Sequence, residues 1–295
     1  MLIALAVAAR IVANPISNAF QKRLTAAPAH PVFIIAATHA LLTAVVAPFA
    51  WHAGMTSLTR AFWLNMAVSA SLAVVGNVLL VYALRAGDLS VLGSINAYKA
   101  VLSLVLGVFL IGEVPSATGA AGVLLILLGS AIVVERGEGH SRGTALVRFF
   151  REPGVQLRFA ALACSATEAV FLKRAVLASA PVLVFYMWSV LGVVVAAVCG
   201  ALVLNGQIGS EMRTFRRRWR MYVCLAAATG VMQLTTLLTF GALQVGYSLA
   251  LFQLSTLISV FLGYRYFQER SIARRLAGAV VMIVGALMIV MGGRR

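Results

Sequence analysis

The chain has 295 residues, of which 62% are hydrophobic and only 11% are charged, and its mean hydropathy is +0.98. A soluble domain is roughly half apolar and about a quarter charged, so this composition excludes a soluble globular protein and indicates an integral membrane protein. The net charge of +16 does not indicate nucleic-acid binding, because the cations lie mostly in short loops between apolar stretches, a pattern typical of membrane topology.

A membrane-spanning helix needs about 20 mostly apolar residues, and on this basis the sequence predicts an all-α integral membrane protein with ten transmembrane helices. The predicted helices of the first half cover roughly 2–20, 32–51, 62–84, 90–111 and 117–134. Those of the second half cover roughly 157–177, 182–204, 221–243, 248–266 and 277–291. We therefore predict a five-helix repeat at 1–134, a polar basic linker at 135–156 and a second five-helix repeat at 157–295.

The two halves share a long motif and a short one. Residues 107–129 recur at 263–285 with one constant offset, which aligns Glu113 with Glu269. The paired glycines of this long motif are Gly107 with Gly263, Gly122 with Gly278 and Gly129 with Gly285. The short motif, which we call the short sequence echo, pairs Phe20, Lys22 and Arg23 with Phe171, Lys173 and Arg174. Small residues on one helix face allow close helix packing, so the glycines are predicted to be scaffold.

Five helices are an odd number, so the second repeat must enter the membrane from the opposite side to the first. The sequence thus predicts two inverted five-helix repeats, an arrangement typical of transporters that alternate access to a central site. Most of the Lys and Arg residues in the loops and at the helix ends fall on one face, including Arg158 and the cluster Arg216, Arg217, Arg218 and Arg220. The other face has Arg60, Lys173, Arg174, Arg294 and Arg295. This bias predicts the first face to be cytoplasmic and both termini to lie outside, with the cluster as a topology anchor close to lipid headgroups.

This arrangement resembles the drug/metabolite transporter superfamily, and its EamA-type members most of all. The resemblance is carried by the repeated motif and by the pairs Ala83-Leu84 and Ala242-Leu243, each with a glycine, Gly87 or Gly246, four residues after the alanine. It implies transport of small metabolites, amino acids or toxic compounds through a cavity lined by the first, third, fourth, sixth, eighth and ninth helices. It also implies cytoplasmic termini, in contrast to the charge bias.

Polar groups recur at helical spacing inside the predicted helices. Arg10, Asn14, Asn18 and Gln21 are spaced by four, four and three residues, so they share one face of the first helix. Asn96, Lys99 and Ser103 form a similar stripe on the fourth helix. An ionisable residue at mid-membrane costs at least about 2.5 kcal/mol, so such residues indicate a function. The predicted substrate-binding residues are Arg10, Asn14, Asn96, Tyr98, Lys99, Glu168, Gln233 and Gln253.

The three deepest charges suggest a substrate class. Arg10 and Lys99 outnumber Glu168 by one positive charge, which favours an anionic or zwitterionic metabolite such as an amino acid or organic acid. The alternative is that Arg10 and Glu168 form a structural ion pair. Glu168 is also a candidate for proton coupling, because desolvation favours the protonated carboxyl group while nearby cations oppose it. His39 is a weaker candidate, since a lone histidine among apolar neighbours more often serves packing.

The sequence therefore predicts a secondary active transporter, expected to export its substrate across the cell (inner) membrane. No phosphate-binding loop indicates ATP drive, and one aspartate, Asp88, with four scattered histidines predicts neither a catalytic nor a metal site. We expect no cofactor and no nucleic-acid partner, contact with membrane lipids, and a monomer or homodimer. The alternatives are a proton-coupled multidrug or cationic-compound exporter that uses Glu168, and a channel or non-transporting membrane sensor.

Overall fold

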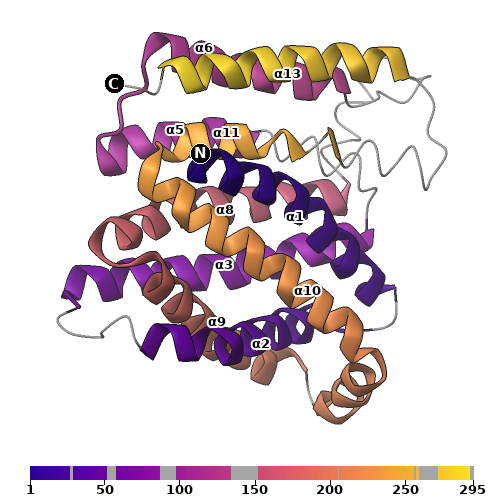
Figure 1. Ribbon diagram of the computed structural model, residues 1–295. Coiled ribbons are helices and arrows are strands. Elements are labelled where there is room, and N and C mark those ends of the chain that lie inside the picture. Colours follow the sequence, from indigo (N-terminus) through magenta and orange to yellow (C-terminus); the bar gives the residue numbers. More distant parts are fainter. Residues whose placement is uncertain are drawn as a thin grey trace.

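The computed structural model describes residues 1–26, 29–51, 58–86, 98–133, 152–204, 206–255, 257–258 and 272–292. Within these residues the fold consists of ten helices and has no strand (Figure 1). The helices are α1 (Leu2–Thr25), α2 (Pro31–Trp51), α3 (Arg60–Ala86), α5 (Tyr98–Ile111), α6 (Ala117–Val133), α8 (Pro153–Ala178), α9 (Pro181–Val203), α10 (Ile208–Ala242), α11 (Val245–Phe252) and α13 (Ile272–Gly292).

Six of these helices are long and apolar enough to cross a membrane, namely α1, α2, α3, α8, α9 and α10. The predicted all-helical membrane architecture is confirmed at this level. The predicted fourth and ninth helices are described only in part, as α5 with 14 residues and α11 with 8 residues. Asn96, Gly263 and Glu269 lie outside the described residues, as does most of the predicted linker.

Helix α10 begins earlier than the sequence predicts. The eighth helix was expected from residue 221, but α10 starts at Ile208 and bends at Arg218, whose φ of −119° and ψ of 22° are not helical. The carboxylate of Glu211 in the first turn favours this start, because it complements the positive end of the helix dipole. The arginine cluster at 216–220 therefore lies on a helix and not in a loop, which corrects the sequence prediction.

Glycines bring the backbones of α6 and α13 into direct contact. A Cβ atom added at Gly122 would lie 2.6 Å from the carbonyl oxygen of Gly285, and one added at Gly129 would lie 2.6 Å from that of Gly278. The predicted role of the repeated glycines in close packing is confirmed at these four positions. Because 122 meets 285 and 129 meets 278, the two helices run antiparallel, side by side at one edge of the bundle (Figure 1).

We expect Gly122→Ala to lower the free energy of unfolding by roughly 1–3 kcal/mol, the usual effect of overpacking a tight contact. The added methyl group would meet a backbone carbonyl, which cannot turn aside as a side chain can. Thermal unfolding of the purified protein in detergent measures the effect. Gly209→Ala is the matched control, because a Cβ atom there has no neighbour within 4 Å. Equal midpoints for the two variants would contradict the packing argument.

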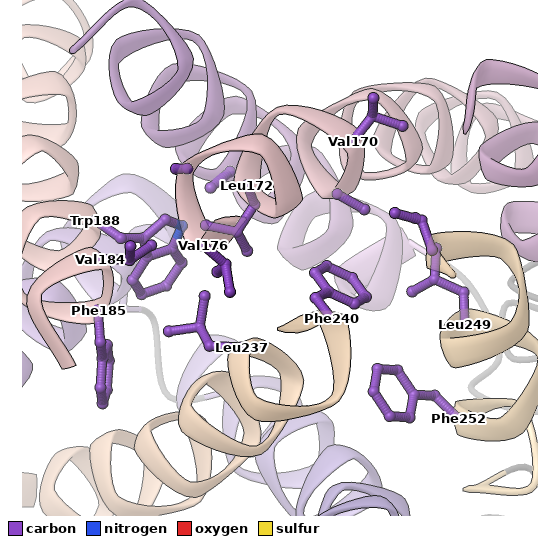
Figure 2. Close-up of a cluster of buried hydrophobic side chains, with 14 of the residues drawn as sticks. Val170, Leu172, Val176, Val184, Phe185, Trp188, Leu237, Phe240, Leu249 and Phe252 are labelled. Atoms are coloured by element: carbon purple, nitrogen blue, oxygen red, sulfur yellow. The ribbon is translucent and has the colours of Figure 1, made fainter. Parts of the chain in front are cut away.

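The remaining helices form the bundle around the site. α1 packs on α10, α3 packs on α8, and α2 packs on α9. Buried side chains of α8, α9, α10 and α11, with others from α2, α3, α6 and α13, make the main apolar core, which includes Leu172, Trp188, Phe240, Leu249 and Phe252 (Figure 2). Those five residues also border the cavity described next.

Candidate functional site

A cavity of about 130 Å³ lies inside the bundle. It is bordered by α1, α3, α5, α8, α10 and α11, the helices that the family resemblance implies, and also by α2 and α9. Its polar and charged lining residues are Arg10, Asn14, Ser17, Asn18, Gln21, Thr38, His39, Asn77, Lys99, Arg158, Ser165, Glu168, Thr229, Gln233 and Thr236.

The polar stripe of α1 faces this cavity. Arg10, Asn14, Asn18 and Gln21 all belong to the lining. Two of them are held by bonds to the second half of the chain: Arg10 Nε donates to Thr236 Oγ1 at 2.8 Å, and Asn14 Nδ2 donates to Ser255 Oγ at 3.2 Å. These bonds fix the polar face of α1 toward the interior.

The guanidinium group of Arg10 lies over an aromatic ring. Its Cζ atom is 4.9 Å from the ring centre of Phe252, within the range of a cation–π interaction. Among the described residues no ion pair joins Arg10 to Glu168, so Arg10 is held by Thr236 and Phe252 and not by the structural ion pair considered above.

Lys99 and Glu168 enter the cavity from neighbouring helices. Lys99 lies in the first turn of α5 and Glu168 in the middle of α8, and both side chains belong to the lining. The two helices are joined next to the site, where Ser103 Oγ donates to the carbonyl oxygen of Ala166 at 3.3 Å. The cavity thus combines cations from α1 and α5 with a carboxylate from α8.

Arg158 is a lining residue that the sequence reasoning missed. It is only 7% exposed, although the sequence placed it at a helix end and counted it with the cytoplasmic charges. The helical spacing of the sequence could have indicated that Arg158 faces the cavity. Arg158, Ser165, Glu168 and Leu172 are spaced by seven, three and four residues and share one face of α8.

His39 and Gln233 both line the cavity but differ in their surroundings. The centre of the His39 ring lies 4.3 Å from that of Trp188, and a Cβ atom added at Gly192 would overlap His39 Nδ1. The histidine therefore fills a close contact between α2 and α9. Gln233 is 5% exposed, and its amide nitrogen has no hydrogen-bond partner within the described structure.

Two other predicted residues, Tyr98 and Gln253, are not brought to the cavity lining. Tyr98 is 58% exposed, with its ring 6.4 Å from that of Phe159. Successive helical residues do not share a face, so Lys99 can point inward while Tyr98 points away. Gln253 is 2% exposed but lies outside the lining residues, and Asn96 is outside the described residues.

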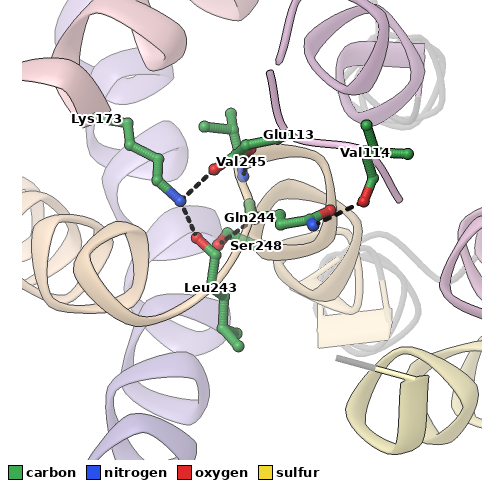
Figure 3. Close-up of polar contacts among 7 residues, drawn as sticks. All are labelled: Glu113, Val114, Lys173, Leu243, Gln244, Val245 and Ser248. Carbon is green, nitrogen blue, oxygen red and sulfur yellow. Dashed lines mark hydrogen bonds and ion pairs between the residues drawn. The ribbon is translucent and has the colours of Figure 1, made fainter. Parts of the chain in front are cut away.

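A second polar cluster joins the two halves near the point where α10 ends and α11 begins (Figure 3). Glu113 forms an ion pair with Lys173, and its Oε2 atom accepts a hydrogen bond from the backbone N–H of Val245 at 2.9 Å. Lys173 Nζ also donates to the carbonyl oxygen of Leu243 at 2.6 Å. Glu113 thus satisfies an N–H group at the start of α11, a group that would otherwise lack a partner.

This cluster corrects the sequence interpretation of Lys173. The lysine was counted among the charges at the membrane faces, but its side chain is 8% exposed and paired. The Glu113 carboxylate likewise bonds to the backbone at the start of α11, a helix of the other half of the chain.

A third contact links the start of α2 to the start of α10. The backbone N–H of His30 donates to Glu211 Oε2 at 3.1 Å, and the ring nitrogen Nε2 of His30 lies 3.2 Å from the hydroxyl oxygen of Tyr82. Partial burial lowers the pKa of His30, and the Glu211 carboxylate opposes that shift. The α1–α2 connection is therefore tied to the beginning of α10.

The six long apolar helices, which enclose a buried polar cavity, are those of a multi-pass membrane protein. Residues 2–135 match the family model described as "EamA-like transporter family", part of the drug/metabolite transporter superfamily, and over these residues the match confirms the family that the sequence motifs indicate. The family points to a transporter and not to an enzyme.

The fold of the whole chain has a counterpart among solved structures. A structure titled "Crystal structure of protein" aligns with 99% of this chain and 98% of its own, with a TM-score of 0.72. At 18% sequence identity this likeness concerns the fold alone. The search of curated proteins gave no match.

Proposed function

We propose that the chain is a secondary active transporter that exports a small anionic or zwitterionic metabolite, such as an amino acid or organic acid. The observation that carries this proposal is the buried cavity, where Arg10 and Lys99 from the first half meet Glu168 from the second. Charged groups inside a membrane protein mark substrate or ion pathways.

Unpartnered hydrogen-bond donors support a ligand that supplies acceptors. Within the described structure, Arg10 Nη1 and the amide nitrogen of Gln233 are buried and have no hydrogen-bond partner. A buried donor without a partner costs about 1–3 kcal/mol. A carboxylate or phosphate oxygen would satisfy both groups, whereas the ammonium group of an organic cation has no acceptor for them.

Alternating access is the proposed mechanism, and helix packing supports an inverted repeat, in which one half can rock against the other. In an inverted repeat, equivalent helices run in opposite directions. Gly122 meets Gly285 and Gly129 meets Gly278 between α6 and α13, and residue 39 of α2 meets residue 192 of α9 while residue 32 meets residue 200. Both pairs are therefore antiparallel. The two halves also pack in an equivalent way. α1 packs on α10, and their counterparts in the other half, α8 and α3, pack on each other.

The two ends of the bundle differ in a way that fits one state of such a cycle. The cavity lining extends along α1 from Arg10 to Gln21 and reaches Arg158 near the start of α8. At the other end of α8, Lys173 and Glu113 tie α8, the α5–α6 connection and α11 together. We propose that this ion pair closes one side of the site, and that it opens when the substrate is released there.

The test of the proposed function is counterflow in proteoliposomes that contain the purified protein. We expect saturable exchange of amino or organic acids, and Lys99→Ala is expected to raise the half-saturation concentration by about tenfold or more, because hydrogen bonds to charged groups contribute about 1.5–3 kcal/mol. Lys22→Ala is the matched control, since Lys22 is not a lining residue.

Other outcomes would point to the alternative functions. A steady ion conductance in a planar bilayer would indicate a channel. Exchange of cationic drugs, with no competition from carboxylates, would indicate the cationic-compound exporter. Equal half-saturation concentrations for wild type and Lys99→Ala would contradict the role of Lys99 in anion binding.

A further inference from the structure

The beginning of α10, residues 208–220, is placed for contact with the membrane surface. It carries five arginines, Arg213, Arg216, Arg217, Arg218 and Arg220, and so many charges exclude it from the bilayer interior. The bend at Arg218 separates it from the apolar remainder of α10, and Figure 1 shows the two parts at an angle. This segment therefore lies at the interface between lipid and water.

One face of the segment is fixed to the bundle. Glu211 is 5% exposed and accepts the hydrogen bond from the backbone of His30. The ring of Phe215 lies 6.5 Å from that of Phe33 and 4.9 Å from that of Tyr222. These contacts hold the helix in place and leave its opposite side free to face outward.

The outward side combines cations with apolar groups. Arg213, Arg216, Arg217 and Arg220 are exposed and define what we call the arginine face. Met212 and Trp219, 42% and 52% exposed, lie on the same segment. Tryptophan is enriched at the level of lipid headgroups, and the guanidinium group of Arg220 lies 5.7 Å from the Trp219 ring centre.

Neighbouring helices add to the positive charge at this end. α1 ends beside the start of the membrane-crossing part of α10, because Leu24 and Tyr222 belong to the same buried cluster. Lys22 and Arg23 lie in the last turn of α1. The carboxylate of the segment itself, Glu211, is buried and accepts a hydrogen bond from the backbone of His30, so it faces the bundle and not the outward side.

We propose that the arginine face binds the headgroup phosphates of anionic phospholipids in the adjacent leaflet. The planar guanidinium group binds phosphate oxygens through two parallel hydrogen bonds. A basic cluster next to a membrane-crossing helix is attracted by anionic lipid. This site is separate from the transport cavity, and the inference does not depend on the substrate.

The experiment measures lipid binding to the purified full-length chain by native mass spectrometry and by thermal stabilisation. The probes are phosphatidylglycerol, phosphatidylcholine and soluble glycerol 3-phosphate. We expect phosphatidylglycerol to bind and stabilise the protein, with an effect that weakens as salt is added. Replacement of all four residues of the arginine face by glutamine should weaken this binding by about tenfold or more.

Two further variants keep the test decisive. Replacement of the same four residues by lysine retains the charge but removes the paired hydrogen bonds, so this variant should bind phosphatidylglycerol more tightly than the glutamine variant and more weakly than wild type. The double variant Arg213→Gln/Arg217→Gln makes a smaller change and should give an intermediate loss. The proposal is overturned if phosphatidylglycerol binds the glutamine variant as well as wild type. It is also overturned if phosphatidylcholine or free glycerol 3-phosphate binds and stabilises as strongly as phosphatidylglycerol.

Discussion

Lys173→Met is expected to lower the free energy of unfolding by about 3–5 kcal/mol, the effect of leaving one buried charge without its partner. The Lys173 and Glu113 side chains are 8% and 13% exposed, so water cannot replace the lost ammonium group. The carboxylate would keep its hydrogen bond from Val245, but Leu243 would lose a donor to its carbonyl oxygen. Unfolding in mixed detergent micelles measures the difference.

The double variant Glu113→Gln/Lys173→Met separates the charge effect from lost packing. Replacing a whole buried ion pair by neutral groups is often close to neutral, so the double variant should recover most of the stability lost in the single one. Lys22→Met is the matched control, because Lys22 occupies the equivalent position in the short sequence echo. In the part of the chain that the structure describes, Lys22 has no ion pair. A double variant as unstable as Lys173→Met would show that packing, and not charge, dominates.

The features of this fold that depend on local helical spacing could be predicted from the sequence. The stripe of Arg10, Asn14, Asn18 and Gln21 could be predicted to face one direction because helical spacing alone fixes it, and all four line the cavity. The glycines at 122 and 129 could be predicted to lie at a helix contact for the same reason, and their contacts with α13 agree.

The features that were missed depend on tertiary structure or on helix boundaries. Lys173 pairs with Glu113 across 60 residues of sequence, and no local pattern encodes such a contact. Arg158 was assigned to a helix end because the sixth helix was expected from residue 157, yet α8 begins at Pro153, and its helical face turns Arg158 inward. The start of α10 was expected to be a loop, because its many charged residues hide the apolar periodicity that indicates a membrane helix.

Glu168→Gln is expected to abolish accumulation of substrate driven by a proton gradient while leaving counterflow intact. The amide has nearly the same shape as the carboxyl group but cannot bind or release a proton in the transport cycle. Exchange of substrate for substrate needs no net proton movement, so it should continue. Glu168 faces the same cavity as Arg10 and Lys99, which places a titratable group beside the proposed binding site.

The measurement compares uptake into proteoliposomes with an imposed pH gradient and uptake with equal pH on both sides. Wild type should accumulate substrate only with the gradient, and Glu168→Gln should reach equal concentrations under both conditions. His39→Gln is the second variant, because His39 also lines the cavity but is packed between Gly192 and Trp188. If His39→Gln loses gradient-driven accumulation and Glu168→Gln retains it, the histidine carries the proton. If wild-type uptake ignores the gradient, proton coupling is absent and the substrate's own gradient drives transport.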